Sequence, residues 1–281
     1  ITLWMPPHGD QSAIAAFLDR KTQAIDALIA ELEALLLLLQ DKRQALITQA
    51  VTKGLDPSVP MKDSGIPWLG EIPAHWEVKR LMHLTQPDRP IMYGIVLPGP
   101  DVEEGVPIVK GGDVAPGRLL LERLKRTTRE IESRYERSRL QGGDIVFAIR
   151  GSIGAAEMVP PELKGANLTQ DAARIAPTSS VEGSWLLHLV RSHPVFAQLE
   201  SGASGAAVKG INICDLKRPF VPVPPLGEQR DIGDFLDSGE ARAKEQQAEI
   251  SMQINELVEY RQALITAAVT GKIDVTQETP Q

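Results

Sequence analysis

The chain has 281 residues, of which 42% are apolar and 24% are charged, a composition typical of a folded protein with one large domain or two smaller ones. Its formal net charge of −7 argues against a protein that coats nucleic acid or an anionic membrane through an excess of lysine and arginine. The one cysteine, Cys214, excludes an intramolecular disulfide framework, and the longest apolar run is far shorter than the roughly 20 residues of a membrane span. We therefore predict a cytoplasmic protein with no membrane partner.

The first predicted element is one long helix between about residues 10 and 52. A Pro-Pro pair precedes it, Asp10 lies in its first turn, and Gly54 is expected to end it in a left-handed conformation. About 43 residues, at 1.5 Å each, give a rod about 65 Å long. A 4-3-4 spacing of apolar residues predicts a coiled-coil seam formed by Ile14, Leu18, Ile25, Leu28, Leu32, Leu35, Leu39 and Leu46.

The middle of the chain has a different character, with most of the prolines and glycines. Its short β-like runs lie at residues 143–149, 173–176 and 220–223. Its helical patterns lie near residues 127–140 and 185–199. This mixture predicts one mixed α/β domain over residues 57–223, with residues 57–64 as the linker that leads into it.

The second long helix repeats the first at a constant offset of about 218 residues, without a gap. The segment PPHGDQ at residues 6–11 returns as PPLGEQ at 224–229, and RQALIT at residues 43–48 recurs unchanged at 261–266. Roughly twenty of some fifty aligned positions are identical, so one module occurs twice. Gly271 is expected to cap the second copy as Gly54 caps the first. The predicted domains are therefore a first helix in residues 1–56, the middle domain, and a second helix with its tail in residues 224–281.

Two packing arrangements are open for these helices. They could lie as surface helices on a globular domain, but each is several times longer than an average helix and outruns a small core. An apolar seam on both helices is better buried when they pair with each other, or with a second copy of the chain.

The acidity belongs to the helices. Residues 1–56 carry 5 basic and 7 acidic side chains, residues 226–281 carry 5 and 11, and residues 57–225 carry 20 and 19. Within the middle domain, a short segment concentrates the basic residues Arg118, Arg123, Lys125, Arg126, Arg129, Arg134, Arg137 and Arg139. Arginine suits phosphates and guanine edges, although a solvated helix face with internal ion pairs explains the segment equally well.

No catalytic, metal or cofactor site is predicted. The five histidines are scattered, and no glycine-rich loop ends in Gly-Lys-Ser/Thr. The segment RGSIG at residues 150–154 has arginine where a nucleophile elbow needs its first glycine, which disfavours hydrolysis at Ser152. A turn in which Gly151 and Gly154 let backbone amides approach a phosphate is the better interpretation.

Several motifs resemble the specificity subunits of type I restriction-modification systems, over nearly the whole chain. GIPWLGEIPAHWEVKRL at residues 65–81 is similar to the opening of that family's target recognition domain, and PVPPLGEQ at 222–229 to its exit into a conserved helix. RQALI at 261–265 and AVTGKID at 268–274 are similar to the end of that helix. The recognition-domain pattern continues in GGDIV at 142–146, RGSIG at 150–154, NLTQDAARIA at 167–176, and GINI at 210–213 with DL at 215–216.

The resemblance implies an α+β fold in which one target recognition domain is flanked by two long helices that form an antiparallel coiled coil. It implies a non-catalytic subunit that reads half of a bipartite double-stranded DNA site and docks methyltransferase and restriction subunits, for DNA methylation and phage defence. Specificity subunits of this family hold two recognition domains, whereas this chain has one. Residues 1–5 align with the end of the middle domain, so the chain resembles either the second half of such a subunit or a half-subunit that pairs with a second copy of itself.

Base recognition is expected from polar and basic residues of the middle domain that lie in or beside predicted loops. The candidates are Lys110, Arg118, Arg150, Ser152, Asn167, Gln170, Arg174, Lys209 and Asn212. The alternative function is a coiled-coil scaffold or protein-interaction module that does not bind DNA.

Overall fold

The computed structural model describes residues 6–202 and 210–275, and its contacts divide the chain into two compact units, residues 1–43 with 240–281 and residues 44–239. Two long helices, α1 (His8–Lys53) and α6 (Leu226–Val269), account for the two copies of the repeat. They begin at equivalent positions and with the same local bond. The side-chain amide of Gln11 donates to the carbonyl of Pro6 at 2.8 Å, as that of Gln229 does to the carbonyl of Pro224 at 2.8 Å.

Glycines end both helices, as predicted. Gly54 and Gly271 have φ angles of 78° and 69°, in the left-handed region that suits glycine. The amide of Gly54 donates to the carbonyl of Ala50, and the amide of Gly271 to that of Ala268. These bonds satisfy carbonyls that the end of a helix leaves without an intrahelical partner.

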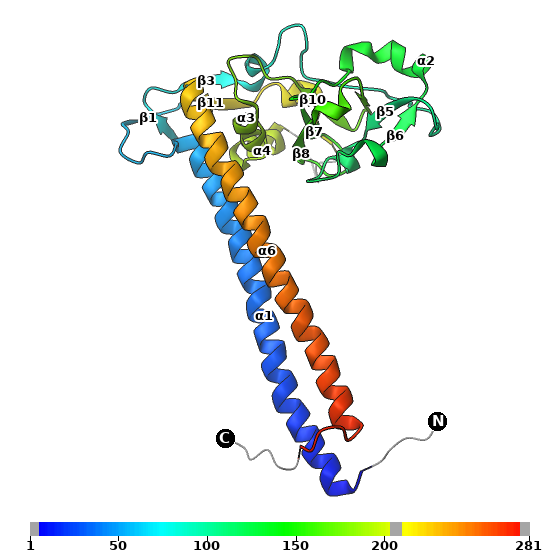
Figure 1. Ribbon diagram of the computed structural model, residues 1–281. Coiled ribbons are helices and arrows are strands. Elements are labelled where there is room, and N and C mark those ends of the chain that lie inside the picture. Colours follow the sequence, from blue (N-terminus) through cyan, green and yellow to red (C-terminus); the bar gives the residue numbers. More distant parts are fainter. Residues whose placement is uncertain (1–5, 203–209, 276–281) are drawn as a thin grey trace. The chain divides into compact units, whose positions relative to one another are not determined.

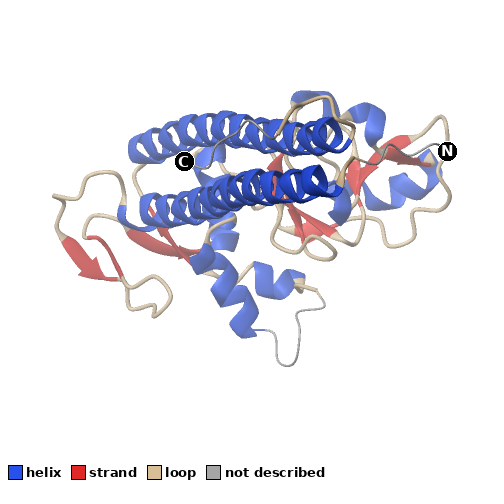
Figure 2. Ribbon diagram, turned by 90° about the horizontal axis from the view of Figure 1, so that it is seen from below, coloured by secondary structure: helices blue, strands red, loops and turns tan. Residues whose placement is uncertain are grey.

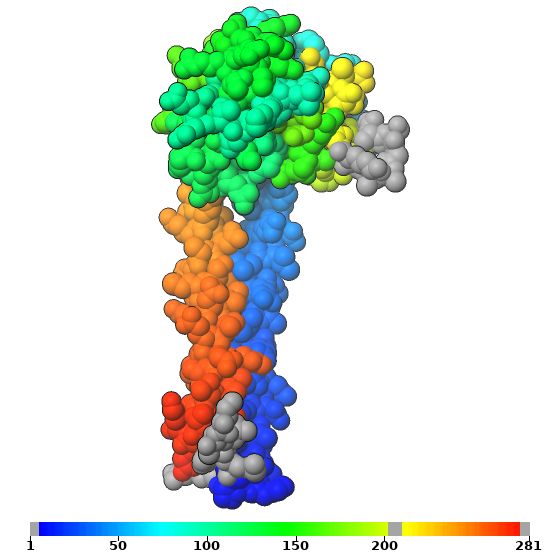
Figure 3. Space-filling view, turned by 90° about the vertical axis from the view of Figure 1, so that its right-hand side faces the viewer, coloured from blue at the N-terminus to red at the C-terminus, as the bar shows by residue number. Residues whose placement is uncertain are grey.

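The first unit is an antiparallel pair of helices, which confirms the predicted coiled coil (Figure 1). Residue numbers rise along α1 as those of the partners fall along α6. Phe17 packs with Ala268, Asp26 pairs with Arg261 at 2.8 Å, and Arg43 pairs with Glu240 at 2.5 Å. The space-filling view shows these parts of α1 and α6 in contact along their length (Figure 3).

The predicted seam is only partly correct. Ile25 is buried, and Ile14, Leu18, Leu32 and Leu39 are half-buried, but Leu28, Leu35 and Leu46 are exposed. A two-helix contact covers a narrow strip of each helix, so apolar residues at the edge of the strip remain in solvent.

The second unit, residues 44–239, holds the mixed domain and the adjoining ends of both long helices. Its strands are β1 (Met61–Asp63), β2 (Glu71–Pro73), β3 (Glu77–Arg80), β4 (Met92–Tyr93), β5 (Val106–Val109), β6 (Lys125–Thr127), β7 (Ile145–Ala148), β8 (Ala156–Met158), β9 (Asn167–Leu168), β10 (Ala172–Ile175) and β11 (Phe220–Val223). Its short α-helices are α2 (Arg129–Glu132), α3 (Gly183–Val190), α4 (His193–Gly202) and α5 (Ile213–Leu216). Its 3-10 helices are η1 (Leu81–Leu84), η2 (Gly111–Asp113), η3 (Leu121–Arg123), η4 (Ser133–Ser138) and η5 (Pro161–Leu163).

These strands form small sheets rather than one large one (Figure 2, red). The largest has the order β4-β10-β7-β8 and is antiparallel. In a second sheet, β5 pairs antiparallel with β6 and parallel with β9. Strand β7 is buried on both faces: Ile145 and Phe147 join one hydrophobic core, and Val146 and Ala148 join another. This alternation follows from the two-residue period of a strand.

The two ends of the domain meet. Strand β3 near its beginning pairs antiparallel with β11 at its end, with Glu77 opposite Val223. The carboxylate of Glu228, in the first turn of α6, accepts a bond from the buried indole of Trp76 at 2.9 Å and contacts the ring of His75 at 2.7 Å. The opening motif and the exit motif, 152 residues apart, therefore form one junction.

Candidate nucleic-acid interface

Four loops of the domain converge through backbone hydrogen bonds. We call residues 109–113, 149–154, 169–171 and 210–212 the loop cluster. The amides of Ile149 and Arg150 both donate to the carbonyl of Asp171, at 2.9 and 3.1 Å, and the amide of Ile211 donates to the carbonyl of Ile149 at 2.8 Å. The amide of Thr169 donates to the carbonyl of Val109 at 2.9 Å, which ties in the fourth loop.

Glycine makes this convergence possible. A Cβ atom on Gly111 would lie 2.3 Å from the carbonyl oxygen of Arg150 and 2.9 Å from that of Asp171, closer than a side chain allows. Gly151 and Gly154 have φ angles of 73° and 87°, so the turn after β7 uses conformations that other residues rarely adopt. The predicted turn is present, with both glycines in the left-handed region.

Five of the nine predicted site residues belong to the loop cluster. They are Lys110, Arg150, Ser152, Gln170 and Asn212. Arg150, Ser152 and Asn212 are exposed, and Lys110 and Gln170 are half-buried. Within residues 6–202 and 210–275, neither the Lys110 ammonium nor the Arg150 guanidinium pairs with a carboxylate. The cluster thus combines two cations with hydroxyl and amide groups, which are the side chains that bind phosphates and base edges.

Asn212 has a structural task as well. Its side-chain oxygen accepts a bond from the amide of Cys214 at 2.9 Å and caps the first turn of α5. The side-chain NH₂ group remains as the donor that can face a ligand.

Arg118 and Lys209 are not assigned to the loop cluster. Arg118 is exposed in a separate turn, where its amide donates to the carbonyl of Ala115 at 3.0 Å. Lys209 lies outside the described residues.

Asn167 and Arg174 were predicted to lie in or beside loops and to be available to DNA, but both side chains are buried in strands. The strand position of Arg174 agrees with the β-like run predicted at 173–176, whereas its predicted availability to DNA is wrong. The side-chain oxygen of Asn167 accepts from Ser138 and from the amide of Leu168, and its NH₂ group donates to Glu132 and to the carbonyl of Tyr135. All its polar groups are therefore satisfied inside the domain. We remove Asn167 from the candidate interface for this reason.

The guanidinium of Arg174 is 1% exposed and donates to the carbonyls of Arg137, Arg139 and Pro90. Burial, and secondarily the neighbouring charge of Arg89, lower the pKa of Arg174 to about 10. The nearby carboxylate of Asp144 opposes that shift, and it holds Arg89 in a two-bond pair at 2.9 and 2.6 Å. Arg174 therefore supports the backbone of the arginine-rich segment from inside the domain. Because its side chain is buried, it is not part of the candidate interface.

The arginine-rich segment divides into two groups. Arg139 pairs with the buried Glu132 at 2.6 Å, Arg134 pairs with Glu130 four residues before it, and Arg126 donates to the carbonyl of Gly105. These three fit the interpretation of internal pairing. Arg118, Arg123, Lys125, Arg129 and Arg137 are exposed and form no ion pair in the part of the chain that the structure describes.

The described residues contain no group of three or more metal-ligating side chains and no helix long and apolar enough to cross a membrane. The Ser152 hydroxyl has no hydrogen-bonded base among them, as a nucleophilic serine would need. Sequence reasoning missed the roles of Asp171 and Gly111, because both act through the backbone, and those contacts exist only in the folded chain.

Comparison with known proteins identifies the family. Residues 100–256, more than half of the chain, match the family described as "Type I restriction modification DNA specificity domain". The chain belongs to this family, which confirms the resemblance in the motifs.

Two curated relatives align with nearly the whole of this chain. The chain is 28% identical over 274 residues to the type I restriction enzyme EcoBI specificity subunit of Escherichia coli, covering 96% of this chain and 58% of the relative. It is 25% identical over 283 residues to the MjaVIII specificity subunit of Methanocaldococcus jannaschii, covering 98% of this chain and 63% of the relative. The chain therefore spans about three fifths of the length of these relatives.

Solved structures share the fold. A chain from a structure describing complex assembly and conformational transition of the type I R-M system aligns with a TM-score of 0.71 at 19% identity, over 96% of this chain and 61% of its own. The HsdS subunit from Thermoanaerobacter tengcongensis aligns with a TM-score of 0.55 at 20% identity, over 96% of this chain and 60% of its own.

Proposed function

We propose that this chain is the non-catalytic part of a type I restriction-modification complex that reads one half of a bipartite DNA site in the cytoplasm. The observation that carries the proposal is the loop cluster, where backbone hydrogen bonds join the loops that carry Lys110, Arg150, Ser152, Gln170 and Asn212. Arg and Gln are suited to guanine and adenine edges in the major groove, while lysine, serine and backbone amides fix the position of phosphates.

Charge supports a role within a complex. The middle domain carries nearly equal numbers of basic and acidic residues, and the helices are acidic, so phosphate attraction by the chain alone is weak. Methyltransferase subunits docked on the helices would supply further contacts to the DNA phosphates. Restriction subunits would then join that complex.

We also propose that a second recognition domain binds the end of the helical pair that is formed by the start of α1 and the end of α6. At the start of α6, Gln229 is 1% exposed and accepts a bond from the amide of Glu182 at 2.9 Å, and Asp237 contacts Ser184 and His188. The equivalent residues at the start of α1 are Gln11 and Asp19. Both are exposed.

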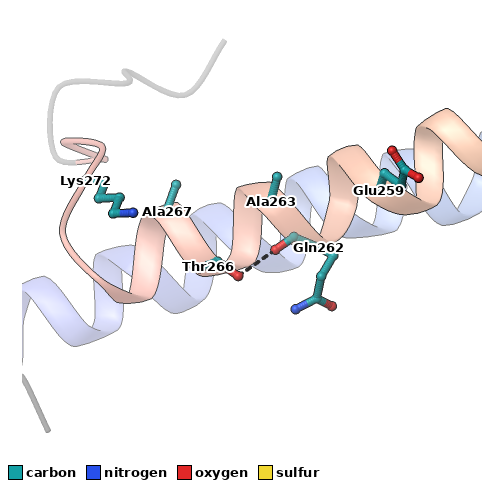
Figure 4. Close-up of a pocket in the computed structure, with 6 residues that line it drawn as sticks. All are labelled: Glu259, Gln262, Ala263, Thr266, Ala267 and Lys272. Atoms are coloured by element: carbon teal, nitrogen blue, oxygen red, sulfur yellow. Dashed lines mark hydrogen bonds between the residues drawn. The ribbon is translucent and has the colours of Figure 1, made fainter.

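The ends of the two helices differ in the same way. Val51, near the end of α1, is fully buried in the core of the second unit, whereas its equivalent in α6, Val269, is 48% exposed. A shallow pocket of about 480 Å³ lies at this end of α6 (Figure 4). Its lining residues are Glu259, Gln262, Ala263, Thr266, Ala267 and Lys272. A preceding domain of the same polypeptide, or the domain of a second copy, would cover these groups.

The test is DNA binding by the chain together with its methyltransferase subunit. The complex should prefer one bipartite duplex over scrambled DNA, and Arg150→Ala should weaken binding at least about tenfold, as expected for loss of a charged base or phosphate contact. Lys79→Ala is the matched control, because Lys79 is an exposed cation on β3 that pairs with Glu77 outside the loop cluster.

Equal affinity of the wild-type complex for both duplexes would refute the proposal. It would favour the scaffold alternative, in which no DNA is bound. The mass of the complex in solution distinguishes one copy of the chain from two.

A further inference from the structure

An apolar loop lies beside the loop cluster. We call residues 93–98, which begin at the last residue of β4 and continue toward β5, the apolar loop; its sequence is YGIVLP. Leu97 is 79% exposed, more than any other large apolar side chain that the structure describes, and Tyr93 and Val96 are 45% and 39% exposed. Ile95 between them is fully buried. The loop therefore anchors one apolar residue in the domain and presents its neighbours to the surroundings.

Hydrogen bonds hold this loop at both ends. The amide of Ile95 donates to the carbonyl of Leu168 at 2.7 Å, and the hydroxyl of Thr127 on β6 donates to the carbonyl of Pro98 at 2.6 Å. Gly94 lies so close to β9 that an added Cβ would be 2.1 Å from the carbonyl oxygen of Leu168. Exposed leucine on a loop fixed in this way loses little conformational freedom when it binds, which favours specific contact.

The apolar loop is joined directly to the loop cluster. The amide of Gln170 donates to the carbonyl of Ile95 at 3.0 Å, so the residue that precedes Val96 is bonded to a candidate base-reading residue. Arg150 belongs to the same cluster, through its bond to Asp171 next to Gln170. The apolar loop and the loop cluster with its amide and cationic residues are thus joined through the backbone.

We propose that Val96 and Leu97 contact the 5-methyl group of a thymine in the half-site that this chain reads. That methyl group is the apolar feature of the major-groove edge of the base pairs, and apolar side chains recognise it. The neighbouring cations and amides favour DNA as the occupant over the apolar surface of a protein. This inference rests on the proposed function and adds a specificity contact that the polar candidates cannot make.

The experiment uses the complex of the full chain with its methyltransferase subunit, bound to its preferred duplex. Each thymine is replaced in turn by deoxyuridine, which removes only the methyl group. At one thymine of the half-site, the wild-type complex should lose about fourfold in affinity, as expected for one buried methyl group.

In Leu97→Ser, the affinity for the unmodified duplex should fall by a similar factor, and the deoxyuridine effect at that thymine should vanish. Leu121→Ser is the matched control, because Leu121 is an exposed leucine of η3 outside the loop cluster and the apolar loop, and it should retain the fourfold effect. Both positions are exposed, so thermal unfolding should be unchanged.

Three results would overturn the inference while leaving the proposed function intact: no thymine is sensitive to deoxyuridine, Leu97→Ser retains the effect, or Leu97→Ser loses the methyltransferase subunit instead. The last result would make the apolar loop a protein-docking surface. If the wild-type complex prefers no duplex at all, the proposed function itself fails.

Discussion

Gly111→Ala tests the loop cluster most directly, because a side chain at this position would collide with backbone atoms, which cannot rotate away as a flexible side chain can. The added methyl would lie 2.3 Å from the carbonyl oxygen of Arg150 and 2.9 Å from that of Asp171, so the loops must separate. Forcing extra volume into a packed site costs about 1–3 kcal/mol. The two amide bonds to Asp171 contribute about 1 kcal/mol each, and separation weakens both. We expect a loss of about 3 kcal/mol in the free energy of unfolding of the second unit.

Gly112→Ala is the control for this substitution. A Cβ on Gly112 meets nothing within 4 Å among the described residues, and alanine lowers the entropy of the unfolded chain, so its stability should change by less than about 1 kcal/mol. Urea unfolding followed by tryptophan fluorescence measures the effect, since Trp76 and Trp185 are fully buried in the second unit.

DNA binding should respond in parallel. A displacement of about 1 Å can cost a well-ordered site a large factor, and we expect Gly111→Ala to weaken binding at least about tenfold. The reasoning is refuted if Gly111→Ala unfolds at the wild-type urea concentration and binds DNA normally, or if Gly112→Ala is equally disruptive.

Three further substitutions test the supporting contacts. Asn167→Ala should destabilise the second unit by about 2–3 kcal/mol in urea unfolding, because it removes four hydrogen bonds and leaves buried partners unsatisfied; a cost below about 1 kcal/mol would contradict the buried network. Hydrogen bonds from Arg139 are the main cause that holds the pKa of Glu132 below its ordinary value of 4.5. The pair therefore stabilises the fold at pH values above the unfolded-state pKa of Glu132. This contribution is lost as the pH falls through the lower folded-state pKa. Wild type should therefore exceed Glu132→Gln in stability at pH 7, with the gap shrinking below about pH 4.5, and a constant gap would refute the assignment. Glu228→Gln should weaken the junction at Trp76 by about 1–3 kcal/mol and alter tryptophan fluorescence, whereas an unchanged urea midpoint would show that the junction contributes little.

The long helices were predictable because their signals are local and repeated. Each helix is marked in the sequence by a Pro-Pro pair, an acidic residue in the first turn and a terminal glycine. In the structure, both helices begin at equivalent positions of the repeat. The strand predicted at 220–223 is β11 with the same bounds. The helix predicted at 185–199 is divided into α3 and α4, because Ser192 and Pro194 interrupt it.

The candidate site was predictable in composition but not in arrangement. Lys110, Arg150 and Gln170 are polar residues next to turns, which sequence reveals. Their convergence depends on backbone bonds to Asp171 between segments far apart in the chain, and no local pattern encodes those. Asn167 and Arg174 have the same polarity as the others, but the buried partners that satisfy them come from distant segments.

The pairing of β3 with β11 has a consequence for how such a domain can change. Glu77 lies opposite Val223, so the chain leaves the domain beside the point where it entered. A segment whose two ends adjoin can be exchanged without pulling the neighbouring structure apart. A different recognition surface could therefore be substituted between these two strands while the helices on either side keep their sequence.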